Sequence, residues 1–390
     1  MLIHELRLAG LLSFGPDTPP LAMQPLNILV GPNGSGKSNF LEAIGLLRSA
    51  ATKLAAPIRG TGGGGVSEWI WKGAPDGSGV VDAVIEYPTS GTKLRHLLEF
   101  GIVSKRFELL DERIENAKPD PGHVDPYFYY RYQNGHPVLS VRGVKKKRQL
   151  ERQDLALDES ILTQRREPDQ YPELAYLADQ YEKVRLYREW SFGRKSIHRN
   201  FQQADLPGDQ LEEDFSNLNL FLNRIASDPK IKRLVVEKLK NLYDGITDFG
   251  MHVVGGALQL SVTEGDYAIP ASRLSDGTLR FLCLLAILCD PNPAPLICIE
   301  EPELGMHPDM LPGIADLLIA ASERTQLVVT THSEILIDAM TDRPESVVVF
   351  DKHDGLTTAQ RLNADDLKIW LKDYRLGRLW SDGQIGGVRW

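Results

Sequence analysis

The stretch Gly31-Pro32-Asn33-Gly34-Ser35-Gly36-Lys37-Ser38 follows the pattern G-x-x-x-x-G-K-S. An apolar run, Leu26–Val30, precedes it, and apolar residues at helical spacing follow it over residues 40–47. This order of strand, glycine-rich loop and helix is the context in which the pattern binds phosphate. The alternative is a glycine-rich turn that carries a lysine by chance.

The physical roles within this loop follow from the residue types. The glycines let backbone N–H groups surround a β-phosphate, and the helix N-terminus adds positive potential. Lys37 reaches the β- and γ-phosphates, and Ser38 ligates Mg²⁺. The sequence therefore predicts a site for ATP and Mg²⁺. The residues expected to contact the nucleotide are Gly31, Pro32, Asn33, Gly34, Ser35, Gly36, Lys37, Ser38 and Asn39.

A second apolar run, Leu296–Ile299, ends in two adjacent carboxylates, Glu300 and Glu301. Two acids side by side at the exit of a buried strand repel each other unless a cation offsets their charge. We assign Glu300 to the Mg²⁺ shell, through water, and Glu301 as the general base that deprotonates the attacking water. The alternative is a pair of solvated acids at the start of a loop.

Two further segments place polar groups at the ends of predicted elements. Ser275 and the amides around Gly277 precede an apolar helix predicted over Leu279–Leu288, and a helix N-terminus is a ready anion site. The apolar run Leu327–Thr330 predicts a strand, and His332 follows it. Taken alone, the first is a helix cap and the second a structural histidine.

In this order, the four segments resemble the Walker A, signature, Walker B and switch-histidine motifs of ABC-type ATPases. The signature segment, Ser-Asp-Gly-Thr-Leu-Arg-Phe-Leu, is similar to the RecF/SMC-like branch, which includes OLD-like heads and bacterial predicted AAA family ATPases. The resemblance covers roughly residues 1–50 and 265–350. It implies an α/β fold: an ABC-type P-loop ATPase head with a mixed, largely parallel central sheet, an antiparallel β subdomain and a helical lobe inserted between Walker A and signature.

The resemblance also implies roles for individual residues. His332 would sense the γ-phosphate beside the catalytic Lys37 and Glu301, and Ser275 with Gly277 would contact nucleotide. The segment 301–308 resembles the D-loop, which meets a partner subunit. Gln164 is the candidate for the glutamine of the coupling loop, a Mg²⁺ ligand. The C-terminal segment, residues 370–390, is similar to a group of bacterial predicted ATPases.

The expected domain organisation has three parts. Residues 1–145 form the N-terminal half of the head with the antiparallel subdomain, 146–245 the helical lobe, and 246–390 the C-terminal half with signature, Walker B, D-loop and switch histidine. Strand pairs are predicted at 80–87 with 94–100, and at 127–132 with 137–141 around the turn Asn134-Gly135. The lobe is expected to be helical. Two helices are predicted from apolar faces that end at Val184 and Leu222, and a third helix is predicted to begin at Asp228-Pro229. The first of these faces comprises Leu174, Leu177, Tyr181 and Val184, and the second comprises Leu211, Phe215, Leu218 and Leu222.

Composition limits the other classes of protein. The chain has 390 residues, 42% hydrophobic and 25% charged, so it is not a disordered chain. Its longest apolar run, Phe281–Cys289, is about half of a bilayer span, so no membrane partner is expected. The cysteines, at 283, 289 and 298, lie in apolar stretches, which suits buried thiols in a reducing cytoplasm.

The net charge of -9 argues against a protein that coats nucleic acid with its whole surface. A local basic excess lies between residues 142 and 199 and is either a solvated face or a phosphate-backbone contact. In the second case its residues should share one face. Those residues are Lys145, Lys146, Lys147, Arg148, Arg185, Arg188, Arg194, Lys195 and Arg199.

Two functions stay open at this point. The resemblance implies an ATP-dependent homodimer, in which the Walker loop of one molecule faces the Ser275 loop of the other. Its closure would clamp or release DNA in repair or in defence against invading DNA. The alternative is a regulatory ATPase scaffold that gates a separate nuclease, toxin or other effector without binding DNA. Two other functions, a transporter subunit and a small-molecule kinase, are less favoured, because neither accounts for the signature segment before the Walker B acids.

Overall fold

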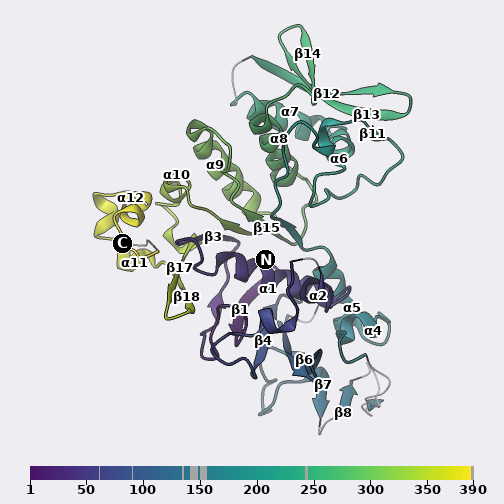
Figure 1. The fold of residues 1–390 in the computed structure, drawn as a ribbon, viewed down its shortest axis with the longest axis vertical. Helices are drawn as coiled ribbons and strands as arrows, with labels where there is room; N and C mark the ends of the chain where they lie inside the picture. The colour runs from purple at the N-terminus through teal and green to yellow at the C-terminus, as the bar shows by residue number, and fades with distance from the viewer. Residues whose placement is uncertain are drawn as a thin grey trace. The chain divides into compact units, whose positions relative to one another are not determined.

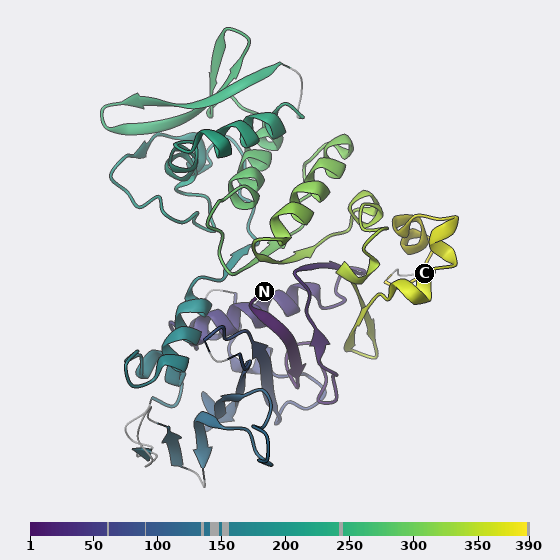
Figure 2. The same ribbon diagram turned by 180° about the vertical axis from the view of Figure 1, so that it is seen from behind.

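The computed structural model describes residues 1–60, 62–89, 91–133, 136–140, 148–149, 156–241 and 245–387. The chain forms two compact units (Figure 1, Figure 2). Unit 1 comprises Met1–Val184, Val348–Leu362 and Ile385–Trp390, and unit 2 comprises Arg185–Val347 and Asn363–Gln384. Both units are therefore discontinuous in sequence. The division expected at residues 145 and 245 is a different partition of the chain and stays a prediction.

Unit 1 contains an antiparallel sheet in the order β2-β1-β4-β5-β6-β7-β8-β9. Buried and half-buried residues alternate along β4, as expected for a strand with one face on a core. The predicted pairing of β4 with β5 and of β7 with β8 is confirmed, and the turn Asn134-Gly135 lies outside the described residues. The strands are β1 (Ile3–Ala9), β2 (Leu21–Ala22), β4 (Ser78–Ile85), β5 (Leu94–Val103), β6 (Arg106–Asn116), β7 (Phe128–Gln133), β8 (His136–Leu139) and β9 (Arg148–Gln149).

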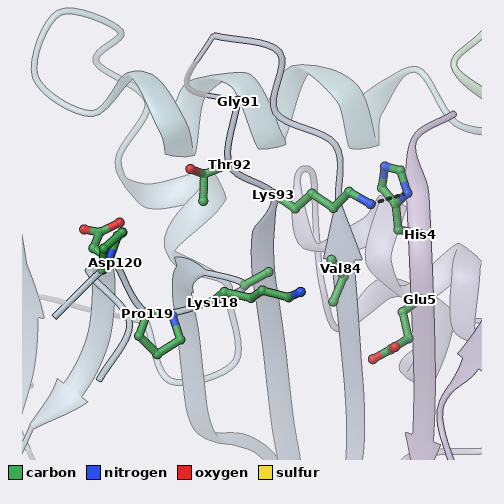
Figure 3. A pocket seen from close by; sticks show the side chains of 11 residues that line it. His4, Glu5, Val84, Gly91, Thr92, Lys93, Lys118, Pro119 and Asp120 are labelled. Carbon is green, nitrogen blue, oxygen red and sulfur yellow. Dashed lines mark hydrogen bonds between the residues drawn. The ribbon is translucent and has the colours of Figure 1, made fainter. Parts of the chain in front are cut away.

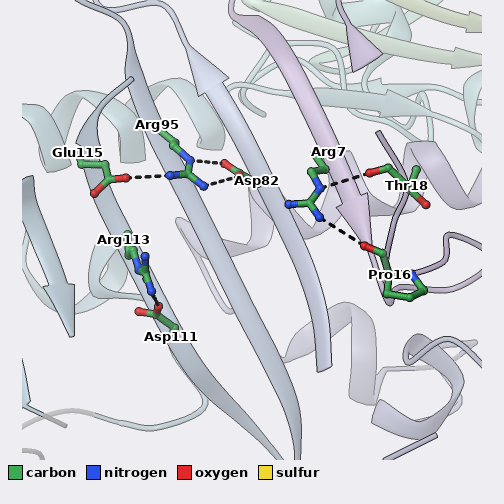
Figure 4. A network of polar contacts seen from close by, with 8 residues as sticks. All are labelled: Arg7, Pro16, Thr18, Asp82, Arg95, Asp111, Arg113 and Glu115. Atoms are coloured by element: carbon green, nitrogen blue, oxygen red, sulfur yellow. Dashed lines mark hydrogen bonds and ion pairs between the residues drawn. The ribbon is translucent and has the colours of Figure 1, made fainter. Parts of the chain in front are cut away.

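A row of charged side chains crosses the half-buried face of this sheet (Figure 4). The Arg95 guanidinium donates to both carboxylate oxygens of Asp82, at 2.9 and 2.7 Å, and to Glu115 at 3.0 Å. The hydrogen bond to Asp82 raises the pKa of Arg95 despite the opposing effect of burial. Arg7 instead donates to the carbonyl oxygens of Thr18 and Pro16. The contacts of Arg95 join three neighbouring strands, β4, β5 and β6.

The nucleotide-loop elements of unit 1 match the predicted order. Strand β3 (Leu26–Val30) is buried throughout, and helix α1 (Lys37–Ala50) begins at Lys37. Strand β3 lies beside β17 (Val347–His353), which pairs antiparallel with β18 (Leu356–Arg361). The remaining helices of unit 1 are α2 (Ala56–Arg59), α3 (Val66–Trp69), α4 (Ile161–Gln164) and α5 (Pro172–Glu182).

A buried polar network fixes the start of α4. Glu112 on β6 is fully buried and accepts hydrogen bonds from His96 Nε2 at 3.1 Å, from the Ile161 amide at 2.8 Å and from the Ser160 hydroxyl. Tyr181 on α5 lies 3.1 Å from the other ring nitrogen of His96. The network joins two strands of the sheet to two helices of the same unit.

Unit 2 contains parallel strands β10 (Arg185–Tyr187), β15 (Leu296–Glu300) and β16 (Gln326–Thr330), with β15 between the other two. The parallel pairing predicted from the continuous apolar runs is confirmed for β15 and β16. Helices α8 (Asp276–Leu288) and α9 (Leu311–Ser322) lie side by side (Figure 1). The three cysteines are buried, as predicted, and burial raises the pKa of Cys289 to about 11.

A second sheet of unit 2 has the order β11-β13-β12, and β14 also pairs with β13 (Figure 2). Its strands are β11 (Gln202–Gln203), β12 (Ile246–Val254), β13 (Ala257–Glu264) and β14 (Tyr267–Pro270). The other helices are α6 (Leu218–Ile225), α7 (Pro229–Leu239), α10 (Glu334–Asp338), α11 (Ala364–Leu367) and α12 (Leu376–Ser381). Short 3₁₀ turns occur at η2 (Ile197–Arg199), η3 (Pro308–Met310), η4 (Pro344–Ser346) and η5 (Trp370–Lys372).

The expectation of a helical lobe is correct only in part. Helix α5 carries the predicted face, and Asp228 caps α7 by accepting from the Lys230 amide at 2.7 Å. The predicted helix over Leu211–Leu222 is wrong, because α6 begins only at Leu218. Asn217 instead closes the preceding loop: its side chain accepts from the Glu212 amide at 2.9 Å and donates to the Gln210 carbonyl at 2.7 Å.

The C-terminal segment packs on α10. The Gly377 amide donates to Asp338 at 2.7 Å, and a Cβ at this glycine would lie 2.4 Å from the Glu334 carbonyl oxygen. The Leu376 amide donates to the Thr341 hydroxyl at 3.1 Å. Helix α12 is therefore attached to the short helix that follows the predicted switch histidine.

Candidate functional site

The Walker A loop of unit 1 is closely packed. Gly36 has a φ of 105°, and a Cβ there would lie 2.4 Å from Thr357 Oγ1 and 2.9 Å from Ser13 Oγ. A Cβ at Gly31 would lie 2.2 Å from the Phe350 carbonyl oxygen. Two of the predicted nucleotide residues thus have to be glycine because β17 and β18 approach the loop on one side.

Lys37 is held against the backbone of the loop. Its ammonium donates to the carbonyl oxygens of Gly31, at 2.7 Å, and Pro32, at 3.1 Å. The Ser35 hydroxyl is buried and has no hydrogen-bond partner within the described part of the chain. A compact loop with a cation drawn against its carbonyls and an unsatisfied hydroxyl fits an oxyanion ligand.

Asn39 belongs to a group of hydrogen-bonded side chains beside the Walker A loop. Its amide donates to Ser13 Oγ at 2.7 Å. The Thr357 hydroxyl on β18 lies 2.7 Å from the same Ser13 oxygen and 2.8 Å from the Ser35 carbonyl oxygen. Ser13, Asn39 and Thr357 therefore form a support for the loop, which the sequence motif does not indicate.

The Walker B acids lie at the end of β15 in unit 2. Glu300 Oε2 accepts from Arg188 Nε at 2.8 Å, and the Glu300 carbonyl accepts from the Trp190 indole N–H at 2.7 Å. An arginine of the same unit thus pairs with Glu300 in this structure. The place of Glu300 in the Mg²⁺ shell stays a prediction.

Glu301 has a φ of 47°, which is uncommon for a residue with a side chain. Its amide donates to the carbonyl oxygen of Thr330 at 3.0 Å, and its Oε1 lies 3.5 Å from His332 Nε2. Backbone strain of this kind is concentrated at functional sites. The structure therefore brings together two residues predicted to act in catalysis.

Glu303 fixes the backbone that carries His332. It accepts from the His332 amide at 2.8 Å and from the Thr331 hydroxyl at 2.7 Å. Burial raises the pKa of Glu303. The sequence places Glu303 only in the D-loop segment, and the structure adds this second role for it.

The signature segment caps α8. Ser275 Oγ accepts from the Thr278 amide at 3.0 Å, and a Cβ at Gly277 would lie 3.3 Å from the Gly305 carbonyl oxygen. A pocket of about 510 Å³ opens here, lined by both the signature and D-loop segments. Its lining residues are Glu264, Ile269, Arg273, Leu274, Ser275, Gly277, Thr278, Gly305, Met306, His307 and Met310.

The shared face expected if the basic residues bind DNA stays a prediction, but two of them are engaged within their own unit. Arg188 is paired with Glu300, and Arg199 is only 6% exposed. Arg194 and Lys195 are exposed, whereas residues 145–147 lie outside the described residues. The physical reason is that both arginines satisfy acids or carbonyls of their own unit, which a count of charges cannot show.

Gln164 lies in unit 1 at the end of α4. Its Nε2 donates to the Glu159 carbonyl at 3.0 Å, and its Oε1 accepts from the Ala156 amide at 2.8 Å. The side chain thus closes its own turn, and these bonds would have to open for it to ligate a metal. Its role as a Mg²⁺ ligand stays a prediction.

A separate pocket of about 650 Å³ lies beside β1, β4 and the turn between β4 and β5 in unit 1 (Figure 3). Lys93 and Lys118 line it together with Glu5 and Asp120, so charges of both signs face it. The Lys93 ammonium lies 2.8 Å from His4 Nδ1. None of the residues predicted to bind nucleotide lines this pocket.

The fold and these motifs define an ABC-type P-loop ATPase head. The chain belongs to the family described as "AAA domain, putative AbiEii toxin, Type IV TA system", whose sequence model matches residues 26–338. The chain is thus an AAA-domain protein, and its fold is that of an ABC-type ATPase head, as the motifs indicated. No curated protein matches the sequence.

Solved structures support the same fold. The chain is 14% identical to an Smc head domain with an extended coiled coil, bound to the C-terminal domain of ScpA and derived from Pyrococcus furiosus. That match covers 96% of this chain and 99% of the other, with a TM-score of 0.54. An Smc head bound to the C-winged helix domain of ScpA is 15% identical, covers 94% and 99%, and has a TM-score of 0.52.

Proposed function

We propose that the chain binds and hydrolyses ATP with Mg²⁺, dimerises head to tail around the nucleotide, and couples this cycle to DNA in the cytoplasm. The observation that carries the proposal is the pair of Glu301 and His332, 3.5 Å apart at the carboxyl end of a buried parallel strand. A strained glutamate beside a histidine suits the activation of water. No helix in the described part of the chain has the length and apolar character needed to span a membrane.

The donor set fits a magnesium ion. No group of three or more His, Cys, Asp and Glu side chains among the described residues forms a complete metal cage. Magnesium bound to a nucleotide does not require one, because it keeps waters and phosphate oxygens and takes one or two protein ligands. Ser38 and Glu300 would supply those ligands, and the ion would neutralise charge that develops on the phosphates.

The roles of the chain's own residues follow from their positions. Lys37 would exchange its bonds to loop carbonyls for phosphate oxygens, and the loop amides would hold the β-phosphate. Glu301 would accept a proton from the attacking water. His332, held by Glu303, would orient Glu301 and sense the γ-phosphate. The products are ADP and phosphate.

Dimerisation is supported by the pocket at the signature segment. Ser275 caps α8 and lines this pocket together with Arg273 and Gly277. A helix N-terminus beside an arginine attracts an anion. We propose that the nucleotide of a second copy places its phosphates there.

The link to DNA is supported by Arg194 and Lys195, which are exposed.

The alternative function, a scaffold that gates a nuclease or toxin, is supported by another observation. Val253, Val254 and Tyr267 on β12 and β14 are 62%, 52% and 77% exposed, which suits contact with a protein. The family description, which names a toxin of a toxin–antitoxin system, also favours it.

Steady-state ATP turnover with and without linear duplex DNA tests these functions, with Glu301→Gln as the blank. Turnover should fall about 10²- to 10⁴-fold in the variant, because the general base is lost. Stimulation by DNA that is absent in the variant would support the DNA-coupled cycle. Turnover that is indifferent to DNA would favour the protein-gating scaffold, and turnover equal in the variant would contradict the assigned base.

A further inference from the structure

The segment 188–199 of unit 2, which follows β10, is anchored at one end to the Walker B acid. Because Tyr187 pairs with Ile299 in register, Arg188 lies beside Glu300. Arg188 donates to the Glu300 carboxylate at 2.8 Å, and the Trp190 indole N–H donates to the Glu300 backbone carbonyl at 2.7 Å. The side chain and the backbone of one residue are thus held by the same segment.

The middle of the segment packs on the signature helix. Arg280 of α8 is 9% exposed, and its guanidinium lies 5.0 Å from the ring centre of Trp190 and 5.0 Å from that of Phe192. Trp190 also stacks on Phe215, with ring centres 5.1 Å apart. A buried cation that contacts two aromatic rings resists being moved without them.

The far end of the segment holds both neighbours of the signature serine. Arg199 is 6% exposed and donates to the Leu274 carbonyl at 2.7 Å and to the Asp276 carboxylate. It also donates to the Gly193 carbonyl at 2.9 Å, which ties the segment to itself. Ser275 lies between the two residues that Arg199 fixes.

We propose that residues 188–199 are a coupling strap that transmits the state of Glu300 to the signature loop. This inference rests on the proposed function, in which Glu300 receives a Mg²⁺ ion. A divalent cation held near Glu300, directly or through a water, competes with the Arg188 guanidinium, because two cations close to one carboxylate repel each other. When Arg188 is released, Trp190 can move. This loosens the packing of Arg280 on Trp190, and it weakens the hydrogen bonds by which Arg199 holds the signature loop. Arg188 and Arg199 are therefore positioning residues.

The strap predicts a response within one molecule, without a dimer and without hydrolysis. Hydrogen–deuterium exchange of amides 274–279 should be measured with ADP, in EDTA and in Mg²⁺, at a protein concentration at which light scattering shows a monomer. In the wild type, Mg²⁺ should speed exchange of these amides about threefold or more. In Arg188→Gln, exchange in EDTA should already match that of the Mg²⁺-loaded wild type.

The matched control is Arg194→Gln, which removes an exposed arginine of the same segment and should behave as the wild type. Trp190→Phe, which removes the indole donor to Glu300 and keeps an aromatic ring at this position, should give a smaller response and serves if Arg188→Gln fails to fold by circular dichroism. Signature amides that do not respond to Mg²⁺ in the wild type, or that respond equally in Arg188→Gln, would overturn the strap. Failure of the Glu301→Gln protein to dimerise with MgATP would instead count against the proposed function.

Discussion

Gly36 shows how tightly the Walker A loop is packed at the scale of a single residue. Replacement by alanine places a Cβ 2.4 Å from Thr357 Oγ1, at a φ of 105°. We expect Gly36→Ala to lower the free energy of unfolding by about 1 to 3 kcal/mol through strain, and to weaken ADP binding. Urea denaturation and ADP titration measure the two effects.

Gly34→Ala is the matched control for stability. Gly34 has a φ of 79°, but a Cβ there would meet no atom within 4 Å. Its loss of stability should therefore be smaller than that of Gly36→Ala, because only backbone strain contributes. Equal losses would show that the approach of Thr357 does not matter.

His198 makes stability depend on pH. The side chain is 1% exposed, and burial, aided by the charge of Arg199, lowers its pKa from 6.5 to about 4. Between these values the unfolded chain binds more protons than the folded chain. The stabilisation is therefore complete above pH 6.5 and is lost as the pH falls toward 4.

Replacing His198 should remove this dependence. Between pH 7 and pH 5, the wild type should lose up to about 2 kcal/mol more of its unfolding free energy than His198→Leu does. Urea denaturation at the two pH values measures the difference. An identical loss in both proteins would mean that the imidazole is not kept neutral by burial.

At the scale of elements, Glu112 decides whether α4 is held against the sheet. The carboxylate is fully buried and accepts from His96, Ile161 and Ser160. We expect Glu112→Gln to lower the unfolding free energy by about 2 to 3 kcal/mol, because the new amide group faces donors. Asp125→Asn, in an exposed loop, is the control and should change little. Equal stability of the two variants in urea would contradict this role.

The short apolar runs predicted the core elements well. Strand β3 occupies the predicted residues, and β15 and β16 each extend the predicted run by one polar residue at one end. A strand buried on both faces is mostly apolar, so a continuous apolar run marks it. The run over Leu211–Leu222 misled for a related reason. Leu211 and Phe215 are apolar because they are buried, although they do not lie in a helix. The pattern of apolar residues could not show that Asn217 closes a loop at this point.

The candidate site was predictable where its residues belong to motifs. Lys37, Ser275, Glu301 and His332 lie in contiguous patterns, and in the structure Glu301 lies 3.5 Å from His332. The supports came only from the structure. Arg199 contacts residues more than 70 positions away, and in the sequence it is one more charge in a basic stretch.

At the scale of the whole molecule, the signature pocket should determine assembly. Ser275→Arg would fill the pocket of about 510 Å³ and leave the Walker A loop of unit 1 unchanged. In the Glu301→Gln background, we expect this variant to keep its ATP affinity within about twofold and to lose the ATP-driven dimer, because its signature can no longer receive a phosphate.

Light scattering with saturating MgATP measures the dimer. Ser272→Arg is the matched control, because Ser272 is exposed nearby but does not line the pocket. The Ser272→Arg protein should dimerise as Glu301→Gln alone does. A Glu301→Gln protein that remains monomeric would contradict the dimer itself.

The contact of Thr357 with the Walker A loop bears on how the protein is made. Thr357 lies 2.8 Å from the carbonyl oxygen of Ser35, across 322 positions of sequence, and unit 1 needs residues 348–362 to be complete. A ribosome that has synthesised the first 184 residues has therefore produced the nucleotide loop without its support. It must translate the whole of residues 185–347 before β18 can close unit 1. The Walker A loop thus acquires its support only after residues 348–362 have been made, when the signature and Walker B segments have already been synthesised.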